Sequence, residues 1–163
     1  MKDSNIEWTD NTFNPWIGCT EVSPGCANCY AKVLDHRMHY TDAGWGKGKP
    51  RHLTSDAQWR QPLKWDEEAR LSGLRVRIFC ASLADIFDDE VPGQWRTELW
   101  ELVDKCRHSD WQILTKRPEN IPAMLPKDWG EEGWPHVWLP VCSVYRASGR
   151  SASEESEGSL NWG

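Results

Sequence analysis

The chain has 163 residues, a length that suits one domain whose core is large enough to fold without disulfides. Its N-terminal residues are polar and mixed in charge, and no apolar run approaches the roughly 20 residues that a membrane helix needs. The net charge of −6 does not favour nucleic acid, and we expect a cytoplasmic protein with no membrane partner.

The N-terminal quarter of the chain predicts a strand, a loop with three cysteines and a helix, in that order. Residues 6–17 mix Trp, Thr, Phe and Ile, which is typical of a short extended segment. Ser23-Pro24-Gly25 is a turn signal that folds the chain back between the first two cysteines. Apolar side chains at roughly helical spacing then predict a helix over 28–40.

Strands and helices alternate along the rest of the chain. A glycine-rich, locally basic loop covers 44–50, and Thr54 or Ser55 can cap a short helix that must break or kink near Pro62. The later elements are a charged stretch over 66–70, a strand over 75–81, a helix over 94–106, a strand over 111–115, a short helix over 121–125 and a strand over 137–139. This alternation predicts an α/β fold with mainly parallel strands, whose ligands bind at the carboxyl ends of the strands.

The composition changes at about Val141. Residues 143–163 contain six serines but one leucine, and they lack the helix that the alternation demands. We therefore expect residues 1–140 to form the α/β domain and residues 141–163 to be a disordered or non-native tail. We also expect the domain to be incomplete, because the chain reads as truncated or altered in reading frame after Leu139.

Three cysteines, Cys19, Cys26 and Cys29, lie close together on a turn, so their thiolates can converge on one metal centre. Three thiolates suit a four-iron cluster that keeps one iron open for a substrate or cofactor. A structural zinc ion is a second reading, which needs a distant fourth ligand or else His36 or His39. A redox dithiol at a helix N-terminus and free buried thiols are two further readings.

Several separated blocks of the sequence occur in the same order in a known family. They are Ile6-Glu7-Trp8-Thr9-Asp10, Asn14-Pro15, Gly18-Cys19-Thr20, Val22-Ser23-Pro24-Gly25-Cys26, Asn28-Cys29-Tyr30-Ala31, Ser82 to Phe87, Val91-Pro92 and Ile113 to Pro118. On these blocks, over about residues 5–139, the chain resembles the phage and prophage proteins labelled gene product 37/68. That family is similar in its three-cysteine loop and alternating elements to radical S-adenosylmethionine enzymes, including the spore photoproduct lyase type.

The resemblance implies a partial (β/α) barrel that holds a 4Fe-4S cluster on Cys19, Cys26 and Cys29. In radical S-adenosylmethionine enzymes the open iron chelates the amino and carboxylate groups of S-adenosylmethionine. Reduction then gives a 5′-deoxyadenosyl radical that abstracts hydrogen from the substrate. The substrate is not implied, and the partner that we expect is nucleic acid or a phage-encoded protein.

Four further residues follow two of the predicted strands, at the edge of the sheet where ligands are expected. Ser82 and Asp85 follow the first of these strands, where they can bind the methionyl amine or the substrate, or instead cap a helix. Lys116 and Arg117 follow the next strand, where the pair can meet a carboxylate or a phosphate.

Two alternatives compete with the iron–sulfur enzyme. A non-enzymatic binding module stabilised by zinc would be colourless and would lose its fold when the zinc is chelated. An inactive fragment of the enzyme would have a weakly stable core, because the tail replaces residues that the alternating fold needs.

Overall fold

Four parallel strands form the central sheet. The structure is a computed structural model that describes residue 4 and residues 6–41 and 44–141. The strands are, in their order across the sheet, β1 (Asn11–Phe13), β4 (Val76–Cys80), β5 (Ser109–Gln112) and β6 (Val137–Trp138). The predicted α/β fold with parallel strands is confirmed. Within the described ranges the sheet is open, since its outer strands β1 and β6 do not pair with each other.

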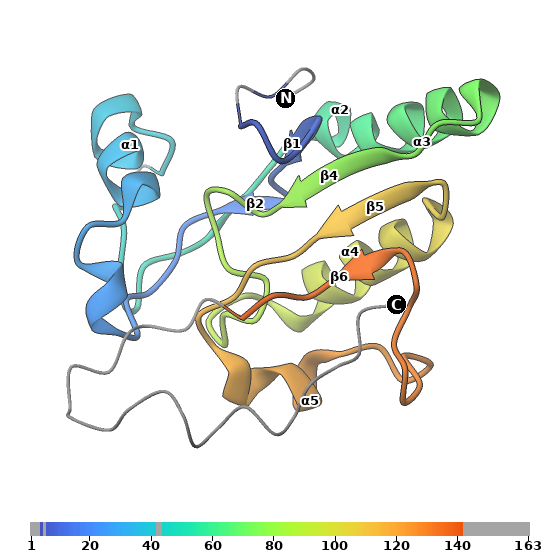
Figure 1. Cartoon of the computed structure of the whole chain (residues 1–163). Coiled ribbons are helices and arrows are strands. Elements are labelled where there is room, and N and C mark those ends of the chain that lie inside the picture. Colours follow the sequence, from blue (N-terminus) through green and yellow to red (C-terminus); the bar gives the residue numbers. More distant parts are fainter. Residues whose placement is uncertain (1–3, 5, 42–43, 142–163) are drawn as a thin grey trace, which may run out of the picture.

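Two long helices, α3 (Gln61–Ser72) and α4 (Gly93–Lys105), lie behind the sheet in the view of Figure 1. Ile78 of β4 pairs in register with Trp111 of β5, so both side chains point to the same face of the sheet, and both are fully buried. Leu99 of α4 belongs to the same core. Burial of this face therefore accounts for the apolar pattern from which the strand over 75–81 was predicted.

The segment over 6–17 forms two strands instead of one. β1 ends before Asn14-Pro15 and β2 (Trp16–Ile17) begins after it, because proline has no N–H to donate to a strand ladder. β2 pairs antiparallel with β3 (His52–Leu53). Both side chains of β3 are exposed, so this strand carries no apolar pattern and was not predicted.

The cysteine loop and its helix follow the predicted order. A 3-10 helix, η1 (Pro24–Cys26), occupies the predicted turn, and α1 covers Tyr30–Met38. His39 follows the last residue of α1 and caps the helix in a left-handed conformation with a φ of 51°. The predicted helix over 28–40 is therefore present, with a shorter extent at both ends.

Pro62 ends one helix and starts the next. α2 (Asp56–Trp59) stops just before it, and Pro62 lies in the first turn of α3, where a proline removes no helical hydrogen bond. The charged stretch over 66–70 lies within α3. Its Asp66 is buried and accepts a hydrogen bond of 2.9 Å from the hydroxyl of Ser109, which fastens α3 to the start of β5.

The last described elements are short: η2 (Pro118–Asn120) and α5 (Ile121–Met124) lie between β5 and β6. Residues 142–163, which make up nearly all of the predicted tail, lie outside the described residues. No helix in the described ranges is long and apolar enough to cross a membrane.

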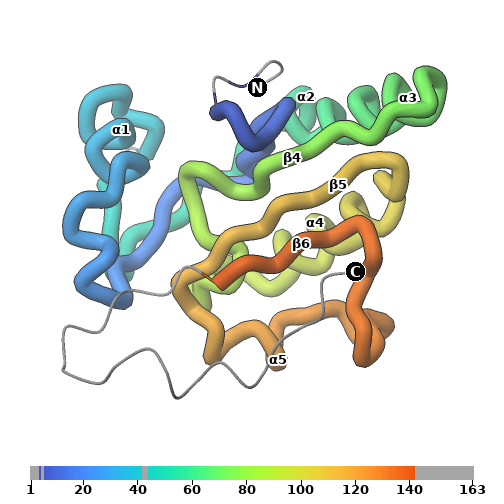
Figure 2. Tube along the Cα trace, in the orientation of Figure 1, coloured from blue at the N-terminus to red at the C-terminus, as the bar shows by residue number. Residues whose placement is uncertain are grey.

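The strands β4, β5 and β6 point toward the side of the molecule that carries the cysteine loop and α1 (Figures 1 and 2). Since the four strands are parallel, their carboxyl ends share this edge. Three segments therefore meet there: the cysteine loop after β2, residues 81–92 after β4 and residues 113–117 after β5. The carboxyl edge of a parallel sheet is the usual place for a ligand.

Candidate functional site

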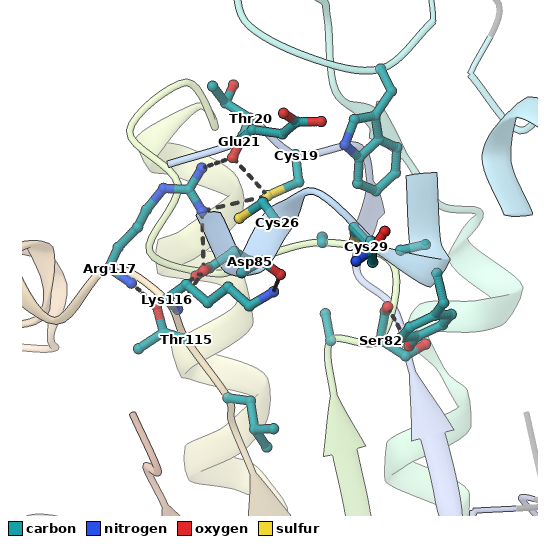
Figure 3. A pocket seen from close by; sticks show the side chains of 18 of the residues that line it. Cys19, Thr20, Glu21, Cys26, Cys29, Ser82, Asp85, Thr115, Lys116 and Arg117 are labelled. Carbon is teal, nitrogen blue, oxygen red and sulfur yellow. Dashed lines mark hydrogen bonds and ion pairs between the residues drawn. The ribbon is translucent and has the colours of Figure 1, made fainter. Parts of the chain in front are cut away.

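A cavity of about 280 Å³ opens at this carboxyl edge. The three predicted metal-binding cysteines and the four predicted cofactor-binding residues all line it, although they come from three distant segments (Figure 3). They are Cys19, Cys26, Cys29, Ser82, Asp85, Lys116 and Arg117. We call this cavity the cysteine pocket. The structure thus brings the predicted residues together, and what they bind stays a prediction.

The three thiols occupy different positions in the cysteine pocket. The Sγ of Cys19 lies 3.4 Å from the Nη1 of Arg117, which donates to it. Cys26 is buried, with its Sγ 3.7 Å from the hydroxyl of Ser23. Cys29 immediately precedes α1, and Figure 3 shows it set apart from the other two, on the side of Ser82.

The spread of these thiols bears on the kind of metal they fit. No group of three His, Cys, Asp or Glu side chains among the described residues converges closely enough to hold one metal ion. A zinc ion needs every thiolate at about 2.3 Å from a single point, whereas a four-iron cluster binds each thiolate through a different iron. Which of these two groups the thiols bind stays a prediction.

The histidines that were considered as a fourth zinc ligand do not join the thiols. His36 and His39 are exposed, and neither lines the cysteine pocket. The zinc reading would therefore need a fourth ligand other than these two histidines.

Arg117 sits at the centre of a buried set of ion pairs beside the thiols. Its guanidinium lies 3.0 Å from a carboxylate oxygen of Asp85 and 3.6 Å from one of Asp88. It also donates a 2.7 Å hydrogen bond to the backbone oxygen of Thr20 in the cysteine loop. Only 1% of its side chain is exposed, so its N–H groups are used to connect the loops and are not available to bind an anionic ligand.

A second buried arginine, Arg51, extends these ion pairs to the glycine-rich loop. It lies 2.7 Å from Asp88 and 3.1 Å from Glu90, and it donates to the Thr20 hydroxyl at 2.6 Å. Its Nη1 also donates to the backbone oxygen of Lys49 at 2.7 Å. This role could not be predicted from local pattern, because the carboxylate partners are 37 and 39 residues away along the chain.

Asp85 serves the protein's own loops in this structure. Its carboxylate accepts hydrogen bonds from the Thr115 hydroxyl at 2.9 Å, the Lys116 backbone N–H at 3.1 Å and the Phe87 backbone N–H at 3.0 Å. The alternative that Ser82 or Asp85 caps a helix is wrong, since the next helix, α4, begins only at Gly93. Asp85 therefore positions the segment after β5.

The remaining wall of the cysteine pocket combines aromatic rings with one available cation. Tyr30, Trp45 and Phe79 line it from α1, the glycine-rich loop and β4, and no local pattern in the sequence marked their rings as ligand contacts. The Nζ of Lys116 donates to the backbone oxygen of Gly25 at 3.1 Å. An ammonium carries three N–H donors, so two of them are left for a ligand.

Burial and hydrogen bonding separate the acidities of two of the thiols. Burial raises the pKa of Cys19 to about 11, although the neighbouring Arg117 guanidinium lowers it. Burial also raises the pKa of Cys26, but hydrogen bonds from the backbone of Val22 and from Ser23 outweigh it and lower that pKa below its ordinary value. In the metal-free protein, Cys26 is therefore more readily a thiolate than Cys19.

The pKa of Arg117 is raised above its ordinary value. Burial alone would lower this pKa, but the Cys19 thiolate, Asp85 and Asp88 raise it. Because burial makes Cys19 a neutral thiol at neutral pH, Asp85 and Asp88 are the negative charges that face the guanidinium there.

Comparison with known proteins identifies a family without a described activity. Residues 3–154 match the family described as a protein of unknown function, DUF5131, and the chain belongs to that family. The chain matches no curated protein and no solved structure.

Replacing Arg117 by Met tests the buried ion pairs. The variant leaves Asp85 and Asp88 buried without one of their cations, so we expect the free energy of unfolding to fall by about 3–5 kcal/mol. Urea unfolding followed by circular dichroism measures this change. Arg70→Met is the matched control, because Arg70 pairs with Glu67 on the exposed side of α3 and its loss should change little. Equal unfolding curves for both variants would refute the role given to Arg117.

Alkylation of the metal-free protein tests the difference between the two thiols. We expect the iodoacetamide rate at Cys26 to level off at a lower pH than the rate at Cys19, which should keep rising until about pH 11. Mass spectrometry of the modified peptides, after short exposures over a range of pH, measures both rates. Coincident pH profiles for the two residues would contradict this assignment.

Proposed function

We propose that this member of the DUF5131 family is an iron–sulfur enzyme of the radical S-adenosylmethionine type, with Cys19, Cys26 and Cys29 as the ligands of a 4Fe-4S cluster. The observation that carries the proposal is that three thiols from one loop line a single pocket at the carboxyl edge of a parallel sheet. When bound, such a cluster would supply the electron that cleaves the sulfonium of S-adenosylmethionine. A partial barrel, a cytoplasmic location and an association with phage belong to the same proposal.

Lys116 is the residue best placed to bind the charged end of S-adenosylmethionine. It lines the cysteine pocket and keeps spare N–H donors, which suit the carboxylate of a methionyl group. Ser82 also lines the pocket, but its hydroxyl accepts a 3.0 Å hydrogen bond from the side chain of Asn14. We therefore give Ser82 a supporting part in holding the wall and Lys116 the ionic contact.

Arg117 and Asp85 hold the loops around the cysteine pocket in place and do not bind the ligand themselves. Their ion pair fixes the segment after β5 against the loop after β4, and the hydrogen bond from Arg117 to Thr20 fixes both against the cysteine loop. The guanidinium also donates to the Sγ of Cys19, so it would partly offset the negative charge of a thiolate bound to iron. These residues would keep the three cysteines in one place while a ligand enters.

The aromatic wall suits the other end of S-adenosylmethionine. Tyr30, Trp45 and Phe79 present flat rings from three elements of the cysteine pocket. Such rings stack on a planar heterocycle, as adenine requires. The pocket thus combines an ionic contact at one residue with apolar contacts at several others, as a zwitterion joined to a nucleoside would need.

Metal analysis tests the cluster. After anaerobic reconstitution we expect about four iron and four sulfide per chain, and the single variants Cys19→Ala, Cys26→Ala and Cys29→Ala should lose most of both because each removes one thiolate. Iron and sulfide assays, with an electron paramagnetic resonance spectrum of the reduced protein, make the measurement.

The matched control for these variants is Cys106→Ala. Cys106 is buried at the end of α4 and does not line the cysteine pocket, so this variant should keep its cluster. Stoichiometric zinc without iron would instead favour the zinc-stabilised module. A cluster whose spectrum S-adenosylmethionine leaves unchanged would favour the inactive fragment.

A further inference from the structure

Arg117 contacts the first cysteine of the cysteine pocket through the same nitrogen that faces Asp85. Its Nη1 donates to the Sγ of Cys19 at 3.4 Å and lies 3.0 Å from a carboxylate oxygen of Asp85. Its Nη2 donates to the backbone oxygen of Thr20 at 2.7 Å and lies 3.6 Å from Asp88. Both terminal nitrogens of the planar guanidinium are therefore held, so the N–H group that faces the sulfur has a defined direction.

The hydrogen bonds at Cys19 and Cys26 differ in the charge of the donor. Cys19 accepts from a guanidinium, whereas the donor beside Cys26 is the neutral hydroxyl of Ser23, 3.7 Å away. The charge of Lys116 also acts on Cys26, but the ammonium donates its hydrogen bond to the backbone oxygen of Gly25. Of these two thiols, Cys19 is therefore the one with a hydrogen bond from a cation.

Burial strengthens the interaction between Arg117 and Cys19. Only 1% of the arginine side chain is exposed, and Cys19 is itself half-buried. Water screens charges weakly in such surroundings, and a hydrogen bond from a charged donor is roughly twice as strong as one between neutral groups. A negative charge that appears at Cys19 is therefore stabilised more by Arg117 than it would be by an exposed cation.

Arg51 supports the same loops without contacting a thiol. Its side chain is also 1% exposed, it lies 2.7 Å from Asp88, and it donates to the Thr20 hydroxyl at 2.6 Å. It does not line the cysteine pocket, and among the described residues its hydrogen bonds go to oxygen acceptors. The two arginines thus share the support of the loops, and the contact with sulfur distinguishes Arg117.

We propose that Arg117 is a positioning residue that raises the reduction potential of the iron–sulfur cluster by donating its Nη1 hydrogen to the thiolate of Cys19. Reduction moves one electron from an external one-electron reductant to the cluster, which adds one negative charge beside that sulfur. Hydrogen bonds to the sulfurs and nearby charge set the potential of such clusters, and a cationic donor favours the reduced form. This inference rests on the proposed function, because it needs a cluster on Cys19.

A redox titration of the full chain, reconstituted anaerobically with iron and sulfide, tests the inference. Arg117→Met removes both the donor and its charge. We expect the equilibrium constant for reduction to fall at least about tenfold, which lowers the potential by about 59 mV for a one-electron couple. Titration with dithionite, followed by electron paramagnetic resonance of the reduced cluster, measures the potential.

Arg51→Met is the matched control. It removes an equally buried positive charge from the same set of ion pairs, but it removes no hydrogen bond to sulfur. Its potential should therefore stay much closer to that of the wild-type protein. Both variants lose a buried cation, so a general loss of loop support would affect them alike.

Arg117→Lys covers the case in which Arg117→Met does not fold. It keeps a buried positive charge, but an ammonium lacks the planar fork that reaches the Cys19 Sγ and the Thr20 oxygen together. Its potential should fall in the same direction, while Arg51→Lys should match the wild-type protein. Resonance Raman spectra give a second readout, since loss of the N–H···S bond should shift an iron–thiolate stretching band in the Arg117 variants alone.

Each result decides the inference. Equal potentials for the wild-type protein and an Arg117 variant, each with a full cluster, would overturn it and leave the proposed function standing. An equal fall in the matching Arg51 variant would also overturn it, because loop support would then explain the change. So would an Arg117→Lys protein that holds no cluster while Arg51→Lys holds one, since Arg117 would then serve assembly. A wild-type protein without a cluster would overturn the proposed function, and this inference with it.

Discussion

The ion pairs of Arg51 and Arg117 with Asp85 and Asp88 hold together the segments that surround the cysteine pocket. Both arginines and Asp88 have 1% or less of their side chains exposed, so each charge depends on its partners instead of on water. Through Thr20 the two guanidiniums reach the cysteine loop, and through Lys49 one of them reaches the glycine-rich loop. These ion pairs and hydrogen bonds therefore hold the cysteine loop and the glycine-rich loop, which contain little regular secondary structure, in fixed positions.

This arrangement separates the residues that hold the pocket from those that can meet a ligand. The carboxylate of Asp85 is occupied by backbone and side-chain donors, among them the backbone N–H of Lys116. The ammonium of Lys116 itself keeps N–H groups that can bind a ligand. The thiols and aromatic rings then form the surface that a cofactor would contact. Tyr30 also lines a second cavity, of about 370 Å³, in which none of the described lining residues is charged.

The strands and helices were largely predictable from local pattern, whereas the contacts between loops were not. The helix over 94–106 and the strand over 75–81 have counterparts in α4 and β4, because burial of one face imposes the periodicity on the sequence. The meeting of Ser82 and Lys116 at one edge followed from parallel topology alone. Arg51 gave no such signal, since a buried ion pair between distant residues leaves no periodic pattern.

The central claim is that the cysteine pocket holds a four-iron cluster with one iron open to S-adenosylmethionine. Mössbauer spectroscopy of the full chain reconstituted with ⁵⁷Fe tests it most directly, because the spectrum distinguishes the irons of one cluster. The account predicts that S-adenosylmethionine changes the parameters of one iron and leaves the other three as they were. A cluster in which no single iron responds, or a protein that assembles no cluster on Cys19, Cys26 and Cys29, would contradict it.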